Sequence, residues 1–344
     1  MTLRWEIAMM RFLATAAAVI LSTAPACTAA DVFLCDTLGG AVVVIDEDTG
    51  ETRFRLITRD HPRAVVVDVK RSLVYAANTG WYVGSENAEP GTVTIFDLTA
   101  VSAGSPSGAM LAEGVPKGAP VREVQVGKSP RGLAMSPSEP LLFVTNQGSD
   151  TVSIVDTERE VVVGEVGVGH VPQGIAHLDG RLYIANHESD SISVVDVSAR
   201  EVIAVIPARP GPKAVVVNPK TRRAYVTSSD DSSVSLLDMD GLALGTTVAL
   251  AERPTEALLT PNGSDLLVSG RDGSVFLLDG TSMQVRSTMR APEPLASLAG
   301  DALRGAPFAI GFSKGAVLRL DLEALEVVET TERRPSANAG EKAL

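Results

Sequence analysis

The sequence contains very little cysteine and few aromatic residues. Only two of its 344 residues are cysteines, Cys27 and Cys35, and aromatic residues make up 4%. If the chain is cleaved before Asp31, as argued below, one thiol remains, which excludes an internal disulfide. Cys35 ends the strand-like run 32–35, so we interpret it as a small buried residue rather than a redox group.

Complete catalytic and cofactor motifs are also missing. The sequence has no Cys-x-x-Cys-His for covalent haem, no Gly-x-Ser-x-Gly nucleophile elbow, no glycine-rich phosphate loop and no closely spaced set of histidines and carboxylates. We therefore expect no cofactor and no metal ion. His177 takes the strand position held elsewhere by Met135 and Val217, so we expect it to pack in the core.

Positive charge is scarce. Lysine and arginine number 30 against 42 acidic residues, giving a formal net charge of −12, and the basic residues form no long run. Because this average field repels a phosphate backbone, we expect no nucleic-acid partner. The apolar stretch Phe12–Leu21 is too short to span a bilayer comfortably, so we expect no transmembrane span.

The N-terminal 30 residues have the order of a secretory signal. A short basic region at Met10 and Arg11 precedes the apolar run, and small residues follow it up to Ala30. This predicts a signal peptide over residues 1–30, with Met10 as an alternative start, and an exported protein in the periplasm or outside the cell. Cys27 offers a lipid anchor as a less favoured alternative, because alanine at position 24 replaces the leucine of a lipoprotein signal.

Strand-like content recurs along the rest of the chain at a fixed period. Alternating β-branched or aliphatic residues closed by an aspartate occur in seven runs: Ala41–Asp46, Gly91–Asp97, Thr151–Asp156, Ser191–Asp196, Ser233–Asp238, Ser274–Asp279 and Ala316–Asp321. By subtraction, the steps between the aspartates are 51, 59, 40, 42, 41 and 42 residues. A period near 40 is typical of propeller blades. We therefore predict an all-β protein, with residues 31–344 forming a single seven-bladed propeller of four-stranded antiparallel blades.

Each predicted blade contains strands A to D, counted from the ring centre outward. Strand A begins at a proline and carries a small residue two places later, as in Pro130-Arg-Gly132. Strand C is the run that ends in aspartate, and we interpret this aspartate as a turn residue. Strand B includes Phe143-Val-Thr-Asn146 and Tyr225-Val-Thr227. These residues resemble the YVTN β-propeller repeat, a family that includes surface, periplasmic and enzyme-associated proteins as well as lactonase-type propellers.

The first blade begins with strand B, at 32–35, and lacks a strand A on its N-terminal side. The C-terminal tail supplies Pro335-Ser-Ala337 at the spacing expected for a further strand A. We therefore expect the tail to pair with the first blade and close the ring.

The D–A and B–C loops are expected to open on one face, which we call the funnel face. The residue after each strand-A proline should surround its centre; Arg63, Arg131, Gln173 and Lys213 hold four of these places. Clustered cations in an acidic protein indicate an anion site. The same face should carry Trp81 and Tyr82 on an insertion, and His170, His187 and Glu188 on loops.

Three functions are compatible with these features. We favour a non-enzymatic, monomeric binding or scaffold protein for a partner protein or a small anionic ligand. The resemblance to lactonase-type propellers implies a hydrolase as an alternative, with Arg63, Arg131, His170, His187 and Glu188 as candidates. The third is an accessory protein of a periplasmic quinone or haem redox system, because related propellers accompany such systems.

Overall fold

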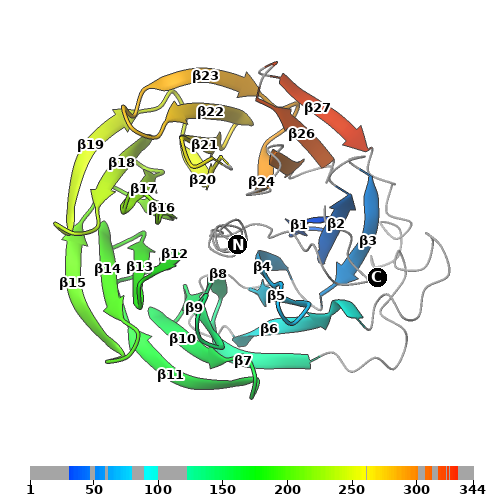
Figure 1. Cartoon of the computed structure of the whole chain (residues 1–344), viewed down its shortest axis with the longest axis vertical. Helices are drawn as coiled ribbons and strands as arrows, with labels where there is room; N and C mark the ends of the chain where they lie inside the picture. The colour runs from blue at the N-terminus through cyan, green and yellow to red at the C-terminus, as the bar shows by residue number, and fades with distance from the viewer. Residues whose placement is uncertain are drawn as a thin grey trace, which may run out of the picture.

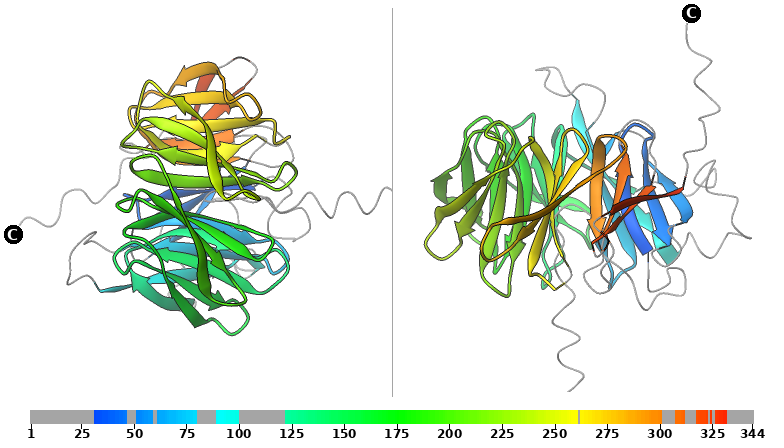
Figure 2. Two further views of the ribbon diagram at one scale, coloured as in Figure 1. Left: turned by 90° about the vertical axis from the view of Figure 1, so that its left-hand side faces the viewer. Right: turned by 90° about the horizontal axis from the view of Figure 1, so that it is seen from above.

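Seven β-sheets surround a central axis in the computed structural model of this chain (Figure 1). The structure describes residues 31–46, 51–58, 61–79, 89–99, 122–260, 262–300, 307–311, 317–322, 324 and 326–331. Within these residues, one sheet has three strands and the other six have four. Seen from the side, the sheets form a thick disc (Figure 2). The predicted all-β, seven-bladed propeller with four-stranded antiparallel sheets is therefore confirmed.

The strands follow one another outward within each blade. Blades 1 to 4 contain β1 (Asp31–Asp36), β2 (Ala41–Asp46) and β3 (Thr52–Ile57); β4 (Pro62–Asp68), β5 (Leu73–Asn78), β6 (Pro90–Asp97) and β7 (Arg122–Lys128); β8 (Pro130–Met135), β9 (Leu141–Asn146), β10 (Thr151–Asp156) and β11 (Val161–Gly167); and β12 (Pro172–Leu178), β13 (Arg181–Asn186), β14 (Ser191–Asp196) and β15 (Glu201–Pro207).

Blades 5 to 7 repeat this order. They contain β16 (Pro212–Asn218), β17 (Arg223–Ser228), β18 (Ser233–Asp238) and β19 (Ala243–Ala249); β20 (Pro254–Leu259), β21 (Asp265–Gly270), β22 (Ser274–Asp279) and β23 (Val285–Arg290); and β24 (Leu295–Gly300), β25 (Pro307–Gly311), β26 (Val317–Asp321) and β27 (Glu326–Thr331). No helix in the described part of the chain is long and apolar enough to cross a bilayer.

The core lies between neighbouring sheets and is filled mainly by aliphatic side chains. The second strand of a four-stranded blade is almost wholly buried, and its tyrosine is among the largest fully buried side chains, as at Tyr75, Tyr183 and Tyr225. The hydroxyl of Tyr225 donates a hydrogen bond to the carbonyl oxygen of Gly280 in the next blade, at 2.7 Å. The repeated tyrosine therefore both fills the core and, in blade 5, links two blades.

Blade 1 differs from the others because its innermost described strand is a strand B. Strands C and D of the other blades pair with a register shift, for example between Ile154 and Val155, whereas their strands B and C pair without one. In blade 1, β1 and β2 pair without a shift, and β2 and β3 pair with a shift between Val44 and Ile45. The assignment of residues 32–35 to strand B is therefore confirmed. The predicted closing segment 335–337 lies outside the described residues.

Side-chain contacts of the predicted turn aspartates are as expected. The carboxylate of Asp156 accepts hydrogen bonds from the backbone N–H groups of Glu158 and Arg159, each at 2.9 Å. Asp196 and Asp279 bond their own turns in the same way. These aspartates stabilise the tight turns after strand C, which confirms their interpretation as turn residues.

Candidate functional site

The strands nearest the axis bring the residues after their first prolines to one level of the central channel. We call β4, β8, β12, β16, β20 and β24 the inner strands; each contacts the next along this series. Arg63, Arg131, Gln173 and Lys213 are the second residues of β4, β8, β12 and β16. Because these positions are equivalent in neighbouring strands, the four residues lie at the same end of the channel.

The three cations of this group make no close ion pair in the described part of the chain. Arg63, Arg131 and Lys213 are half-buried, yet within the described residues none of them makes an ion pair or a side-chain hydrogen bond, and the Nε of Arg63 is buried without an acceptor. Several arginines on the periphery are paired; Arg209, for example, contacts Asp231 at 2.7 Å. Partly dehydrated, unpaired cations are costly unless an anion joins them.

Burial and mutual repulsion perturb these cations. Burial first, and then the charge of Arg63, lower the pKa of Arg131 to about 10. Burial first, and then the charge of Arg131, lower the pKa of Lys213 to about 8. The pKa of Arg63 is also lowered, by burial. All three groups are therefore still mainly cationic at neutral pH, and they interact electrostatically with one another.

A carboxylate that the sequence reading did not select, Glu256, lies among these cations. It is the third residue of β20, and one of its oxygens accepts a hydrogen bond from the backbone N–H of Leu298 on β24, at 2.8 Å. Burial raises the pKa of Glu256 to about 7, opposed by the Leu298 hydrogen bond and by the charges of Lys213 and Arg131. We call Arg63, Arg131, Lys213 and Glu256 the channel cluster.

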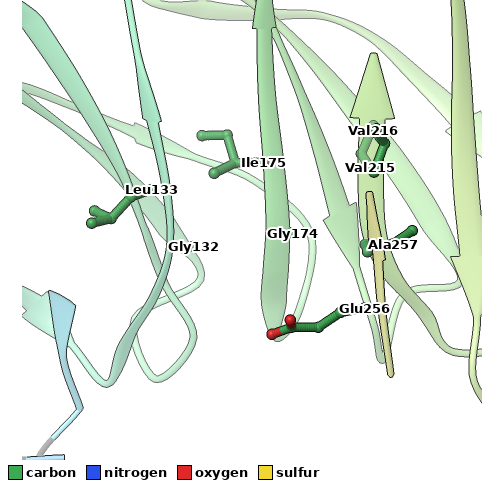
Figure 3. A pocket seen from close by; sticks show the side chains of 9 residues that line it. Gly132, Leu133, Gly174, Ile175, Val215, Val216, Glu256 and Ala257 are labelled. Carbon is green, nitrogen blue, oxygen red and sulfur yellow. The ribbon is translucent and has the colours of Figure 1, made fainter. Parts of the chain in front are cut away.

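The channel cluster adjoins a small hollow with mostly apolar walls. The hollow has a cavity volume of about 40 Å³ and is lined by inner strands of four successive blades, through Gly132, Leu133, Gly174, Ile175, Ala214, Val215, Val216, Glu256 and Ala257. Figure 3 shows the Glu256 side chain extending from β20 toward the strand that carries Gly174. This volume admits a group of a few atoms, such as a small ion.

Cys35 lies beside the same channel. Its side chain is 2% exposed, which confirms that it is a buried small residue. Burial raises the pKa of the Cys35 thiol, and the negative charges of Glu256 and Asp36 raise it further, against the opposing charge of Arg63. The thiol therefore stays protonated at neutral pH and acts as an uncharged part of the channel wall.

The two predicted histidines and Glu188 do not line the hollow. His170 is 74% exposed and its Nδ1 lies 2.7 Å from the Asp150 carboxylate. His187 contacts the Ser229 hydroxyl at 3.3 Å, and Glu188 is exposed. Trp81 and Tyr82 lie outside the described residues, so their predicted place over the channel stays a prediction.

Glycine at the third position of an inner strand allows the strands to approach closely. A Cβ on Gly132 would lie 2.4 Å from the carbonyl oxygen of Gln173, and a Cβ on Gly174 would lie 2.5 Å from that of Lys213. On β20 this position is Glu256 instead. The exception was visible in the sequence as Pro254-Thr-Glu256, where the Pro-x-small pattern fails, and it is the signal that could have identified Glu256.

The described residues contain no group of three or more histidine, cysteine, aspartate or glutamate side chains placed to hold a metal ion. His177, predicted to pack, stacks on Phe143 with ring centroids 5.3 Å apart, which confirms the prediction. Burial lowers its pKa, which favours the neutral ring.

Comparison with known proteins supports the fold and leaves the family open. No family model and no curated protein matches the chain. Among solved structures, the dihydro-haem d1 dehydrogenase NirN in complex with DHE is similar with a TM-score of 0.61 and 15% identity, covering 88% of this chain and 64% of that one. Hydrazine synthase of Kuenenia stuttgartiensis has a TM-score of 0.49 and 22% identity, covering 57% and 64%. The chain thus spans less than two thirds of either protein, and the likeness is that of a seven-bladed propeller.

Proposed function

We propose that this chain is an exported, monomeric propeller that binds a small anion in its central channel through Arg63, Arg131 and Lys213. The observation that carries the proposal is the set of three half-buried cations that make no close ion pair or side-chain hydrogen bond with the described residues. A charged ligand in a partly dehydrated hollow interacts more strongly than one at an open surface. An anion would also offset the repulsion between the cations themselves.

The placement of the predicted histidines gives hydrolysis no support, and Glu256 is the one acidic group of the channel cluster that could act as a base. A hydrolase of the lactonase type would need a base or nucleophile next to its substrate. The two candidate histidines, His170 and His187, instead lie on the outer loops, where they face Asp150 and Ser229. Membership of the YVTN-repeat family is a proposal of the same standing and rests on the strand-B residues quoted above.

A second candidate function is that of an accessory protein in a haem redox system. It is favoured by the likeness to the NirN structure over 88% of this chain, which is an analogy at the level of the fold. Titrating the purified protein with haem and recording the visible spectrum tests it: a shifted absorption band with saturation supports this function, and an unchanged spectrum excludes haem binding.

Ring closure is also a proposal. We infer that the segment around Pro335 adds the missing strand A of blade 1, beside β1. Support comes from the three-stranded sheet of that blade and from the register of β1, β2 and β3, which makes β1 a strand B without a strand A beside it in the described residues.

The anion site is tested by binding measurements on arginine variants. A thermal-shift screen of small carboxylates and oxyanions should give ligands that raise the melting temperature. For the best of them, R63Q and R131Q should each weaken binding about tenfold or more, because a hydrogen bond to a charged group contributes roughly 1.5–3 kcal/mol. R159Q makes the same chemical change at an exposed arginine in the turn after strand C, and it should bind like the wild type. Equal loss in all three variants, or no loss in any, would contradict the proposal.

A further inference from the structure

Glu256 occupies a register position that is otherwise reserved for small residues. The equivalent residues on β8, β12 and β16 are Gly132, Gly174 and Ala214. Where these small residues let adjacent strands come together, Glu256 instead places a carboxylate at the hollow and attaches to β24 through the N–H of Leu298. Glu256 therefore adds a titratable group to the channel at a position where the neighbouring inner strands have none.

The charges around this carboxylate come from several elements. Arg131 on β8 and Lys213 on β16 act on it directly, Arg63 on β4 acts on both of these cations, and Arg271 in the turn after β21 acts on Lys213. On β1, the Cys35 thiol interacts electrostatically with Glu256 and with Asp36. Asp36 is itself paired with Arg55. β12 contributes only the uncharged Gln173, and β24 only the backbone N–H of Leu298.

We propose that a small oxyanion enters the channel together with one proton, which is taken up by Glu256. This inference rests on the proposed function. In the empty channel the ionised carboxylate serves as an internal counter-charge for Arg131 and Lys213. A bound anion would bring a second negative charge into the same partly dehydrated space, and the two would repel. Protonation from solvent removes this repulsion, and the new O–H can donate to the oxyanion while the other oxygen keeps the Leu298 hydrogen bond.

Protonation of Glu256 costs little free energy near neutral pH. Because burial raises the pKa of Glu256 to about 7, the carboxyl is partly protonated there even without a ligand. Lys213, whose burial lowers its pKa to about 8, loses its charge at higher pH and weakens anion binding in a second step. Ionisation of Glu256 and loss of the charge on Lys213 both weaken anion binding as pH rises. Because they belong to different residues, variants can separate them.

Sulfate is a suitable probe because it stays a dianion over the whole range. Its affinity should be measured by calorimetry between about pH 6 and about pH 9, in two buffers of different ionisation enthalpy. Wild-type protein should bind sulfate more weakly at about pH 8 than at about pH 6, by about tenfold or more. Proton uptake at about pH 8 should come mainly from Glu256 and in part from Lys213.

Three variants assign the effect. In E256Q, sulfate affinity should be nearly constant from about pH 6 to about pH 7.5, without proton uptake by this group, and at about pH 8 it should exceed that of the wild type. K213R should keep the lower step and lose the upper one, because arginine stays charged. E201Q makes the matched change on β15 at the outer edge of blade 4, and it should behave like the wild type.

The outcomes distinguish the two proposals. Sulfate binding with unchanged affinity from about pH 6 to about pH 8, or an E256Q variant with the pH dependence of the wild type, overturns proton uptake and leaves the anion site standing. Should wild-type protein and E256Q both fail to bind sulfate at any pH, the anion site itself is wrong. The proton uptake of K213R, in which position 213 stays charged, tests the inference independently if E256Q does not fold.

Discussion

The inner strands can approach closely because single positions in them are glycine, which has no Cβ. Gly174 is the clearest case, since a Cβ there would lie 2.5 Å from the Lys213 carbonyl oxygen and 2.8 Å from the Cα of Ala214. Both are backbone atoms, which can move only if β16 shifts away from β12. The position therefore fixes the distance between blades 4 and 5 next to the channel.

We expect G174A to lower the free energy of unfolding by about 1–3 kcal/mol, the usual cost of overpacking. Urea unfolding followed by circular dichroism measures this. The control is G167A on β11, where an added Cβ would meet no atom within 4 Å; it should cost nothing or stabilise slightly, because alanine restricts the unfolded chain. If both variants lose the same stability, the effect comes from glycine in a strand and not from the contact between blades.

At the scale of residues, the sequence alone predicted some of the side-chain contacts. The turn role of Asp156 follows from its short polar side chain at the end of a strand. In the structure its carboxylate accepts a hydrogen bond from the backbone N–H of Glu158. Asp150 lies in the turn between β9 and β10, and its carboxylate accepts a hydrogen bond from the N–H of Val171 at 2.8 Å, 21 residues away. That contact depends on the path of the loop between β11 and β12, and the residues around Asp150 do not determine this path. Glu256 was missed for a similar reason, because its role appears only when five inner strands are brought together.

At the scale of elements, strand order was predictable because each strand is short, alternating and bounded by turn residues. The bounds of β10, β14, β18 and β22 end at the aspartates that mark the repeat. The register shifts between strands C and D were not predictable, since they leave no distinct residue pattern. Those shifts nevertheless give the independent argument that β1 is a strand B.

The tail should matter for stability if it supplies the missing strand. Removal of residues after Thr331 should lower the melting temperature by several degrees, because the edge of β1 would lose its proposed partner. Differential scanning calorimetry of the processed protein measures this. Truncation after Gly340 keeps the segment 335–337 and should melt like the full chain. Closure by the tail would be wrong if the longer deletion melted at the temperature of the shorter one.

At the scale of the whole molecule, Glu256 should link stability to pH. Its folded pKa of about 7 lies above its ordinary value of 4.5, so between these values the folded protein holds a proton that the unfolded chain lacks. Stability from this group therefore increases as pH falls through about 7 and is fully gained below about 4.5.

Between about pH 8 and about pH 5.5, the wild type should gain on the order of 2 kcal/mol in unfolding free energy relative to E256Q. Urea unfolding of both proteins at the two pH values gives this difference, and the comparison cancels groups that the two proteins share. A constant difference across this range would show that Glu256 has an ordinary pKa in the folded protein.

The contrast between an acidic exterior and a cationic channel has a consequence for rates. With a net charge of −12, the molecule repels an anion at long range, whereas Arg63, Arg131 and Lys213 attract it only once it is within the channel. Added salt screens the long-range repulsion most strongly, since the channel is partly shielded from solvent. Anions should therefore associate faster as ionic strength rises, the reverse of an electrostatically steered ligand, and small, mobile ions should reach the site ahead of large polyanions.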